Sequence, residues 1–370
     1  MPSAITRIKV DLPPRSYEVL IGSGLLLESG KHLRAVFGTD KSLFVITVPP
    51  VRRRWGKKLM TALAAEGLSA KVLEMPDSER HKRLSTVEAL AEKLIQLGAE
   101  RNAVVVAFGG GVVGDVAGMV ASIYMRGVDV VQIPTTVLAQ VDASIGGKTG
   151  VNLRTGKNLL GTFLQPRVVL IDPSLLSTLP ERDFRAGLYE SLKCGVIGNP
   201  ELFRRLEKIK IKSLRRDSSA LHSIISESAK LKAEVVSADE REGGLRRVLN
   251  FGHTIGHALE AESNYRRFLH GEAVGWGMIA ATHIAIAIGR LDQKTGNQIT
   301  DSVLALGPLP KVTADGRKIL RLLQADKKTT NGQVHFVLPT AIGKVEIVND
   351  VPELVIVKAV EMLRKLSARF

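Results

Sequence analysis

A continuous apolar run that leads directly into three glycines constrains the fold of this chain more than any other feature of its sequence. Residues 103–108 have the length and unbroken apolar character of a β-strand covered on both faces, which is typical of parallel sheets. Gly109, Gly111 and Gly114 follow with the spacing G-x-G-x-x-G, and such glycines let a pyrophosphate approach the backbone at the start of a helix. The pattern favours a dinucleotide site. A turn that simply needs glycine is the alternative, because no acidic residue ends a strand about 20 residues later.

Strand-length and helix-length segments alternate through the first half of the chain. We expect strands at residues 41–47, 70–75, 103–108, 130–134 and 168–172. We expect helices at residues 57–67 and, opened by a capping box at 85–88, up to residue 98. This alternation predicts a doubly wound α/β fold of the Rossmann type.

The pattern changes after Pro180, where long helical segments begin. We expect helices at residues 181–198, 200–214, 217–238, 253–263, 271–290, 294–306 and 352–368, with one strand pair at 334–338 and 344–348. Because 370 residues exceed one ordinary core, we predict two domains. The first is an α/β domain over residues 1–180, and the second is a mostly helical domain over residues 181–370.

The net charge of the chain indicates which kinds of molecule it can bind. The chain has 52 lysines and arginines against 37 aspartates and glutamates, a net charge of +15. A basic surface can bind nucleic acid or gather small anionic substrates. The basic stretches at residues 52–58 and 204–216 do not interleave aromatic side chains as single-strand binders do. We therefore expect a small anionic substrate and no nucleic acid.

The number of cysteines and the length of the apolar segments indicate the cellular compartment of the protein. The single cysteine, Cys194, excludes an internal disulfide and any multi-cysteine zinc site. The first residues have no charged head followed by an apolar run, as a secretory signal would. The longest uncharged apolar stretch, residues 273–289, falls short of the about 20 residues that a membrane span needs. We expect a cytoplasmic protein with no membrane partner, and a buried core helix at 273–289.

A second glycine-rich segment, residues 144–158, contains two lysines and two asparagines. It lacks the spacing G-x-x-x-x-G-K-[ST] of an ATPase phosphate loop, because Asp142 stands where the first glycine would be. Lysine and amide side chains among glycines suit phosphate groups, whereas a glycine-rich surface turn is the alternative.

Three of the eight histidines lie within eighteen residues of one another. His253 and His257 are four residues apart and share a helix face, and His270 follows. Thr254 replaces the glutamate of H-E-x-x-H, which excludes that class of zinc protease. Two imidazoles with one carboxylate, for which Glu190 is the candidate, form a typical open catalytic zinc site. The spacing leaves open which of the three histidines are ligands.

These segments together resemble one family, the 3-dehydroquinate synthases, over nearly the whole chain and in the same order. The matching segments are residues 109–118, 124–127, 132–152, 156–161, 177–182, 232–242, 246–260, 270–274 and 325–339. Ser78 and Arg80 depart from the family's Asp-Gly-Glu-Lys motif, and Thr47 stands where an acidic or amide residue often meets the adenine ribose. Tyr189 and Cys194 also differ from the residues usual around the family's glutamate and lysine.

The resemblance implies an N-terminal NAD-binding α/β domain and a C-terminal helical zinc domain, usually in a homodimer, with Co²⁺ able to substitute for zinc. It implies a carbon–oxygen lyase that converts 3-deoxy-D-arabino-heptulosonate 7-phosphate to 3-dehydroquinate and phosphate in the shikimate pathway of aromatic amino-acid biosynthesis. The steps would be transient oxidation by NAD, phosphate elimination, re-reduction and an intramolecular aldol closure. Oxidation makes the neighbouring proton acidic, which explains why an enzyme without net redox change would need NAD.

The resemblance also implies roles for individual residues. The metal ligands would be Glu190, His253 and His270. The other catalytic positions would be His257, Glu242, Lys148, Asn250 and Lys193. The substrate contacts would be Arg126, Asp142, Asn158, Lys232, Arg246, and Lys327 or Lys328. The NAD contacts would be Asp77, Glu79, Arg80, Lys82, Gly110, Gly111, Val112, Asp115, Thr135, Thr136, Lys157, Leu175 and Thr178. Lys148, Asn158, Asn250 and one of the paired lysines are expected to meet the substrate phosphate.

Two related activities are alternatives. A sugar-phosphate cyclase of antibiotic biosynthesis would share the fold and the first steps, but Asn250 and His257 follow the 3-dehydroquinate synthase pattern. A metal-dependent polyol dehydrogenase would release NADH in net turnover. A basic nucleic-acid-binding protein, from a different class, would explain neither the glycines nor the histidines.

Overall fold

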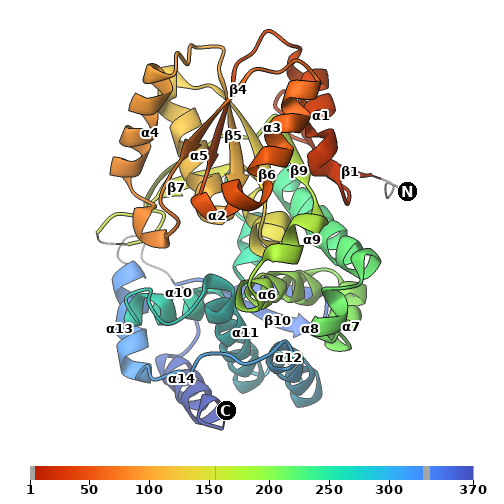
Figure 1. Cartoon of the computed structure of the whole chain (residues 1–370). Coiled ribbons are helices and arrows are strands. Elements are labelled where there is room, and N and C mark those ends of the chain that lie inside the picture. The colour runs from red at the N-terminus through yellow and green to blue at the C-terminus, as the bar shows by residue number, and fades with distance from the viewer. Residues whose placement is uncertain (1–4, 155, 328–333, 370) are drawn as a thin grey trace. The chain divides into compact units, whose positions relative to one another are not determined.

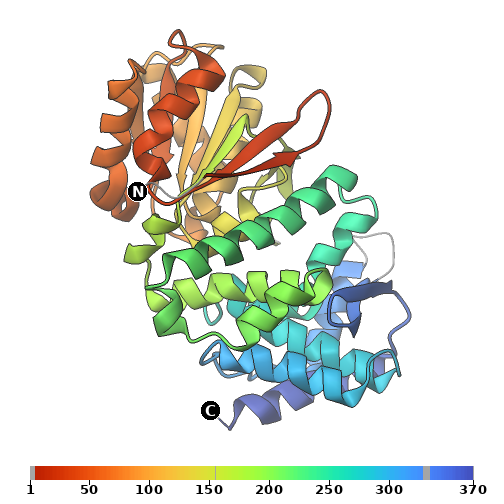
Figure 2. The same ribbon diagram turned by 90° about the vertical axis from the view of Figure 1, so that its right-hand side faces the viewer.

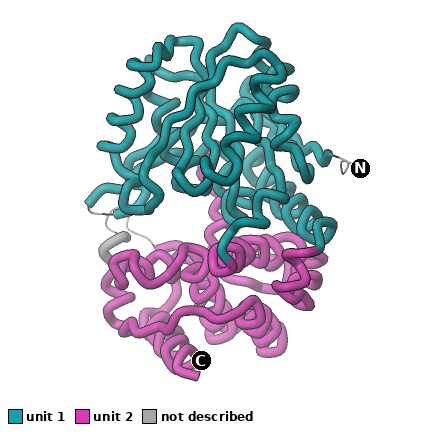
Figure 3. Tube along the Cα trace, in the orientation of Figure 1, with its two compact units in different colours: residues 1–180, 217–240 teal, residues 181–216, 241–370 magenta. Residues whose placement is uncertain are grey.

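The computed structural model describes residues 5–154, 156–327 and 334–369 of the chain (Figure 1). It forms two compact units (Figure 3): unit 1 comprises residues 1–180 and 217–240, and unit 2 comprises residues 181–216 and 241–370. The first segment of unit 1 ends at the predicted boundary. Helix α9 (Ser218–Ala238), which we predicted in the second domain, instead belongs with unit 1, where it contacts β1. The division into an NAD-binding and a metal-binding domain stays a prediction.

Unit 1 is built on a seven-stranded sheet with the order β1-β2-β9-β6-β5-β3-β4. Its strands are β1 (Thr6–Val10), β2 (Tyr17–Ile21), β3 (Leu43–Thr47), β4 (Ala70–Glu74), β5 (Val104–Gly109), β6 (Asp129–Pro134) and β9 (Val168–Ile171). β1 runs antiparallel to β2, and Figure 2 shows these two red strands at one edge of the sheet. The other neighbouring strands are parallel.

Helices cover both faces of this sheet. The α-helices of unit 1 are α1 (Ser29–Phe37), α2 (Pro49–Val51), α3 (Lys57–Ala65), α4 (Leu84–Gln96), α5 (Gly111–Ile123) and α9. Val105 and Ala107 of β5 pack in one core cluster with residues of α4 and α5, whereas Val104 and Val106 pack in another cluster with residues of α1 and α3. Successive side chains of a strand point to opposite faces, so every residue of β5 is buried. The predicted doubly wound α/β fold is confirmed.

Some local predictions for unit 1 were incomplete or wrong. The predicted capping box is wrong, because Arg83 is the extended residue that precedes α4 and Ser85 lies inside the first turn. Strands β1 and β2 were not predicted. The glycine-rich segment forms another unpredicted strand pair, β7 (Lys148–Val151) and β8 (Leu160–Phe163). Gly161 has no room for a side chain there, since its Cβ would lie 2.1 Å from the Thr149 carbonyl oxygen.

Unit 2 is mostly helical, as predicted. Its α-helices are α6 (Glu181–Ile197), α7 (Pro200–Glu207), α8 (Ile211–Leu214), α10 (His253–Glu262), α11 (His270–Ala287), α12 (Gln293–Ala305), α13 (Gly316–Lys327) and α14 (Glu353–Ser367). The hairpin of β10 (Phe336–Ala341) and β11 (Lys344–Val348) matches the predicted strand pair. The single helix predicted at 200–214 is wrong, because the extended backbone at Lys210 separates α7 from α8. Helix α13 was not predicted.

Helix α11 contains the apolar stretch that was predicted to form a buried core helix. Trp276, Met278 and Ile279 are completely buried, which confirms the predicted core helix. Within the described part of the chain, no helix combines the length and apolar character needed to cross a membrane.

Candidate functional site

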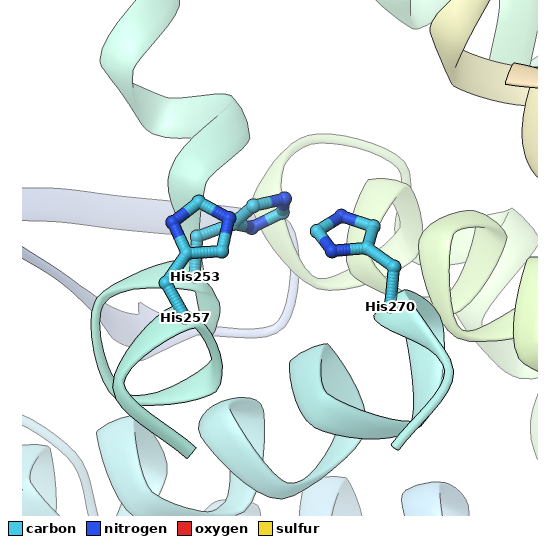
Figure 4. A group of neighbouring side chains, drawn as sticks. All are labelled: His253, His257 and His270. Carbon is cyan, nitrogen blue, oxygen red and sulfur yellow. The ribbon is translucent and has the colours of Figure 1, made fainter. Parts of the chain in front are cut away.

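The starts of two neighbouring helices in unit 2 bring three histidines together. His253 is the first residue of α10, His257 lies one turn later, and His270 is the first residue of α11. Figure 4 shows the three rings pointing toward one another from these helices. Each ring offers a nitrogen, and these nitrogens lie within 4.8 Å of one another. His253 is buried and His257 is exposed.

Glycines allow the helices that carry the candidate ligands to pack with their backbones in close contact. Gly252 has a φ of 81° at the start of α10, a left-handed conformation that favours glycine, and its Cβ would lie 2.8 Å from the Val274 carbonyl oxygen of α11. Gly271, directly after His270, would place a Cβ 1.8 Å from the Ala186 carbonyl oxygen of α6. The backbones of α6, α10 and α11 therefore approach closely where the candidate ligands lie.

Glu190 on α6 faces the histidine cluster. Its side chain is completely buried, and its Oε1 lies 3.5 Å from His270 Nε2 and 3.8 Å from His253 Nε2. Its Oε2 lies 2.5 Å from Lys193 Nζ, one turn further along the same helix. Lys193 is itself 2% exposed, so a buried cation partly balances the buried carboxylate.

This donor set fits a divalent metal ion. Ligands bonded at about 2.0 Å to one tetrahedral zinc lie about 3.3 Å apart, close to the separations between Glu190 Oε1 and the two Nε2 atoms. Among the described residues, none donates a hydrogen bond of acceptable geometry to Glu190 Oε1. A buried acceptor of this kind calls for a further electrophilic partner. His257 also belongs to the histidine group, so the geometry alone admits it as a ligand.

Glu260 is a residue of this site that the sequence reasoning missed. It lies two turns after His253 on α10, is 1% exposed, and its Oε2 lies 3.2 Å from His270 Nδ1. The seven-residue spacing from His253 was the available signal, because it places both side chains on one face of a helix.

The other predicted residues of unit 2 lie in the segment before α10 and at the end of α13. Asn250 Nδ2 donates to Glu242 Oε1 at 2.7 Å, which joins two predicted catalytic side chains. Arg246 is buried. Lys327 is the last residue of α13, and the structure describes its backbone but not its side chain. Lys328 lies outside the described residues.

In unit 1 the predicted dinucleotide loop lies at the carboxyl end of β5. Gly109 ends the strand, Gly110 precedes α5 and Gly111 begins it. Thr135 N donates to the Gly109 carbonyl oxygen at 2.9 Å, and a Cβ on Gly110 would lie 3.0 Å from Thr136 Cγ2. The loop backbone thus lies beside the two predicted threonines. Val112 follows in the first turn of α5, where amide groups can hold a phosphate.

An ionic network next to this loop joins several predicted cofactor residues. Lys82 is 4% exposed, forms an ion pair with Asp115 and donates to Asn158 Oδ1 at 2.5 Å. Burial raises the pKa of the Asp115 carboxyl, and Lys82 opposes that shift. Glu79 Oε1 accepts from Asn152 Nδ2 at 2.8 Å and lies 3.7 Å from Lys157 Nζ. Residues from three distant segments of the sequence therefore meet here.

Two further predicted substrate residues meet in unit 1. Lys232 of α9 forms an ion pair with Asp142, which lies in the helical turn Ala139–Ala143. Lys148 is exposed at the start of β7. Arg126 is exposed, with a φ of 70°.

The structure does not connect the remaining predicted cofactor residues to the ionic network beside the glycine loop by a described contact. Asp77 and Arg80 are exposed. Thr178 Oγ1 accepts from Trp55 Nε1 at 3.1 Å, and the side chain of Leu175 is buried in the core. Thr47, at the position where a ribose contact was expected, donates its hydroxyl to the Phe108 carbonyl oxygen at 2.7 Å.

Comparison with known proteins places the chain in a family. Residues 72–186 match the family model of the 3-dehydroquinate synthase N-terminal region, and residues 187–329 match that of its C-terminal region. A curated 3-dehydroquinate synthase from Koribacter versatilis is 54% identical over 363 residues, which cover 98% of this chain and 99% of the relative.

Two solved structures are similar to this chain over nearly their whole length. One is a 2-epi-5-epi-valiolone synthase from Streptomyces hygroscopicus subsp. jinggangensis with NAD⁺ and Zn²⁺ bound, at 31% identity and a TM-score of 0.87, covering 96% of this chain and 98% of that one. The other is a 2-deoxy-scyllo-inosose synthase complexed with carbaglucose-6-phosphate, NAD⁺ and Co²⁺, at 26% identity and a TM-score of 0.83, covering 97% and 99%. With the family models and the curated relative, these matches confirm the resemblance seen in the sequence: the chain belongs to the 3-dehydroquinate synthase family.

Proposed function

We propose that the chain catalyses the conversion of 3-deoxy-D-arabino-heptulosonate 7-phosphate to 3-dehydroquinate and phosphate. The observation that carries this proposal is the 54% identity to a curated 3-dehydroquinate synthase over nearly the full length of both chains. The two cyclases of other specificity are 31% and 26% identical. The proposal therefore favours the heptulosonate phosphate over the substrates of those cyclases.

We propose Glu190, His253 and His270 as ligands of one divalent metal ion, with zinc as the resident metal and Co²⁺ as a substitute. The short distances from Glu190 Oε1 to the two Nε2 atoms support this choice. The cofactor NAD would lie on the loop of Gly110 and Gly111. When bound, the metal supplies Lewis acidity and NAD supplies reversible acceptance of a hydride.

The chain's own side chains have defined tasks in this proposal. Lys193 holds the Glu190 carboxylate in position through their 2.5 Å contact. Glu242 orients the Asn250 amide toward the substrate, since it accepts one of the amide hydrogens. His257, exposed beside the two ligating rings, moves a proton between the substrate and solvent. These tasks separate metal binding from proton transfer among three neighbouring histidines.

Each unit, taken by itself, has basic or amide side chains whose chemistry suits an anionic group of the substrate. In unit 1, we propose that Lys148 and Asn158 bind the phosphate and that Lys232, held by Asp142, binds another polar group. In unit 2, buried Arg246 is the proposed partner of an anionic group. Charge-assisted hydrogen bonds of this kind are strong and directional.

Phosphate release measured together with NADH absorbance tests the function. The purified chain, given the heptulosonate phosphate, should release phosphate without net NADH, and His270→Ala should not. One NADH formed per turnover would indicate a polyol dehydrogenase instead. Faster phosphate release from a hexose phosphate that lacks the carboxylate would indicate a cyclase of other specificity.

We also propose a homodimer and a cytoplasmic location, in keeping with the family's biosynthetic role and the single buried cysteine. Light scattering of the purified chain tests the assembly, and a molar mass of one chain would contradict it.

A further inference from the structure

The buried carboxylate of Glu260 links the two helices that carry the proposed histidine ligands. Glu260 belongs to α10 and is 1% exposed, and its Oε2 lies 3.2 Å from Nδ1 of His270 at the start of α11. A carboxylate buried to this extent is costly unless it accepts hydrogen bonds. The contact therefore constrains the ring as well as the carboxylate.

This contact decides which nitrogen of His270 can bind a metal. An ionised carboxylate only accepts hydrogen bonds, so the facing Nδ1 must carry the hydrogen and Nε2 keeps its lone pair. Nε2 is the atom that lies 3.5 Å from Glu190 Oε1. The assignment of the hydrogen follows from the acceptor it meets.

His253 has the same arrangement with a different acceptor. Its Nδ1 lies 3.2 Å from the Phe251 carbonyl oxygen, which only accepts, and its Nε2 lies 3.8 Å from the same Glu190 Oε1. Both rings therefore present Nε2 to one carboxylate oxygen. The backbone holds one ring, and a side chain that can be replaced holds the other.

We propose that Glu260 is a positioning residue of the metal site, an inference that rests on the proposed ligand set of Glu190, His253 and His270. It fixes the ring plane and tautomer of His270, without touching metal or substrate. Carboxylates that contact metal-bound histidines typically change metal affinity by about 10–100-fold when replaced. A purely structural pair between α10 and α11 would affect folding and leave the affinity of the folded protein for metal unchanged.

Titration of the metal-free chain with Co²⁺, followed by the visible absorption of bound cobalt, tests the proposal without turnover. Glu260→Gln keeps the size of the side chain and removes its charge, so we expect Co²⁺ affinity to fall by about 10–100-fold with an altered spectrum. Glu262→Gln is the matched control, because Glu262 lies on the same helix and pairs with Lys318 Nζ at 2.9 Å. This control should bind Co²⁺ as the wild-type chain does.

Wild-type affinity and an unchanged cobalt spectrum in folded Glu260→Gln would overturn the proposal. If that variant does not fold, ¹⁵N NMR of the zinc-loaded wild-type chain decides instead: ligation through Nε2 of His270 is expected, and ligation through Nδ1 refutes the role of Glu260. Equal Co²⁺ binding by the wild-type chain and His253→Ala would show that the metal site itself is misplaced. That outcome would remove the ligand set along with this inference, whereas the Glu260→Gln result alone leaves the ligand set standing.

Discussion

Replacing Gly271 by alanine tests whether the helix that carries His270 must lie directly against the helix that carries Glu190. A Cβ at position 271 would lie 1.8 Å from the Ala186 carbonyl oxygen, whereas Cβ contacts below 3.0 Å essentially never occur. The obstacle is backbone and cannot rotate away, so α11 must move from α6 by at least 1.2 Å, the difference between these distances. Metal–ligand distances tolerate only about 0.2 Å. His270, the residue before the substitution, should therefore leave the proposed ligand set.

The expected magnitudes follow from this displacement. Overpacking costs about 1–3 kcal/mol, which should lower the melting temperature by about 2–12 °C for a unit of this size. The zinc Kd should rise by at least about tenfold, equivalent to about 1.4 kcal/mol. Competition titration with a chromophoric chelator measures the Kd, and differential scanning fluorimetry measures the melting temperature.

Gly296→Ala on α12 provides the control for Gly271→Ala. It adds the same methyl group to a helix, but there the Cβ would lie 2.3 Å from Cδ1 of Ile286, the flexible end of a side chain. The Ile286 side chain can change rotamer, so we expect zinc affinity close to that of the wild-type chain. Gly271→Ala protein with wild-type melting temperature and zinc Kd would refute the requirement for close contact between α6 and α11.

Three further substitutions separate the proposed roles. Lys193→Met removes the cation that lies 2.5 Å from Glu190 and should destabilise the metal-free chain by about 3–5 kcal/mol. Zinc should then raise the melting temperature of this variant more than it raises that of the wild-type chain, as measured with and without chelator. An equal rise in the two proteins would contradict this prediction. His257→Ala should keep one zinc per chain by atomic absorption but turn over slowly, and the reverse result, with His270→Ala still loaded, would exchange their roles. Lys148→Ala should weaken substrate binding or slow turnover by about 10–100-fold with unchanged NAD affinity by titration. Lost NAD affinity with unaltered substrate kinetics would place Lys148 on the cofactor.

The predictable part of the fold is the part that is buried on both faces. Strands β3, β5 and β9 have no exposed residue, so they stand out as continuous apolar runs. Exposed and partly buried residues alternate along β8 and along the first four residues of β1, and neither sequence carries such a run. Helix α13 was missed although Ile319, Leu320, Leu322 and Leu323 have the spacing of an apolar helix face. The sequence thus indicates the central strands β3, β5 and β9 better than β1 at one edge of the sheet.

Side-chain pairing between distant segments has no comparable signal in one sequence. Family resemblance named Lys82, Asp115 and Asn158 for separate roles, in two cases the cofactor and in one the substrate. The structure joins them, because Lys82 contacts both other side chains. A substitution of Lys82 should therefore disturb the proposed cofactor contacts and the proposed substrate contact together. Assigning a role to each residue separately would not predict this joint effect.

The choice among the three histidines shows the same limit most clearly. Spacing places His253 and His257 on one helix face, so sequence periodicity admits both as ligands of one metal. The orientation of a ring depends on what its other nitrogen meets, and that partner is a backbone carbonyl for His253 and the Glu260 carboxylate for His270. Both contacts direct Nε2 toward Glu190 Oε1. The proposed ligand set therefore depends on groups that the histidine spacing does not reveal, and the cobalt spectrum of Glu260→Gln measures that dependence directly.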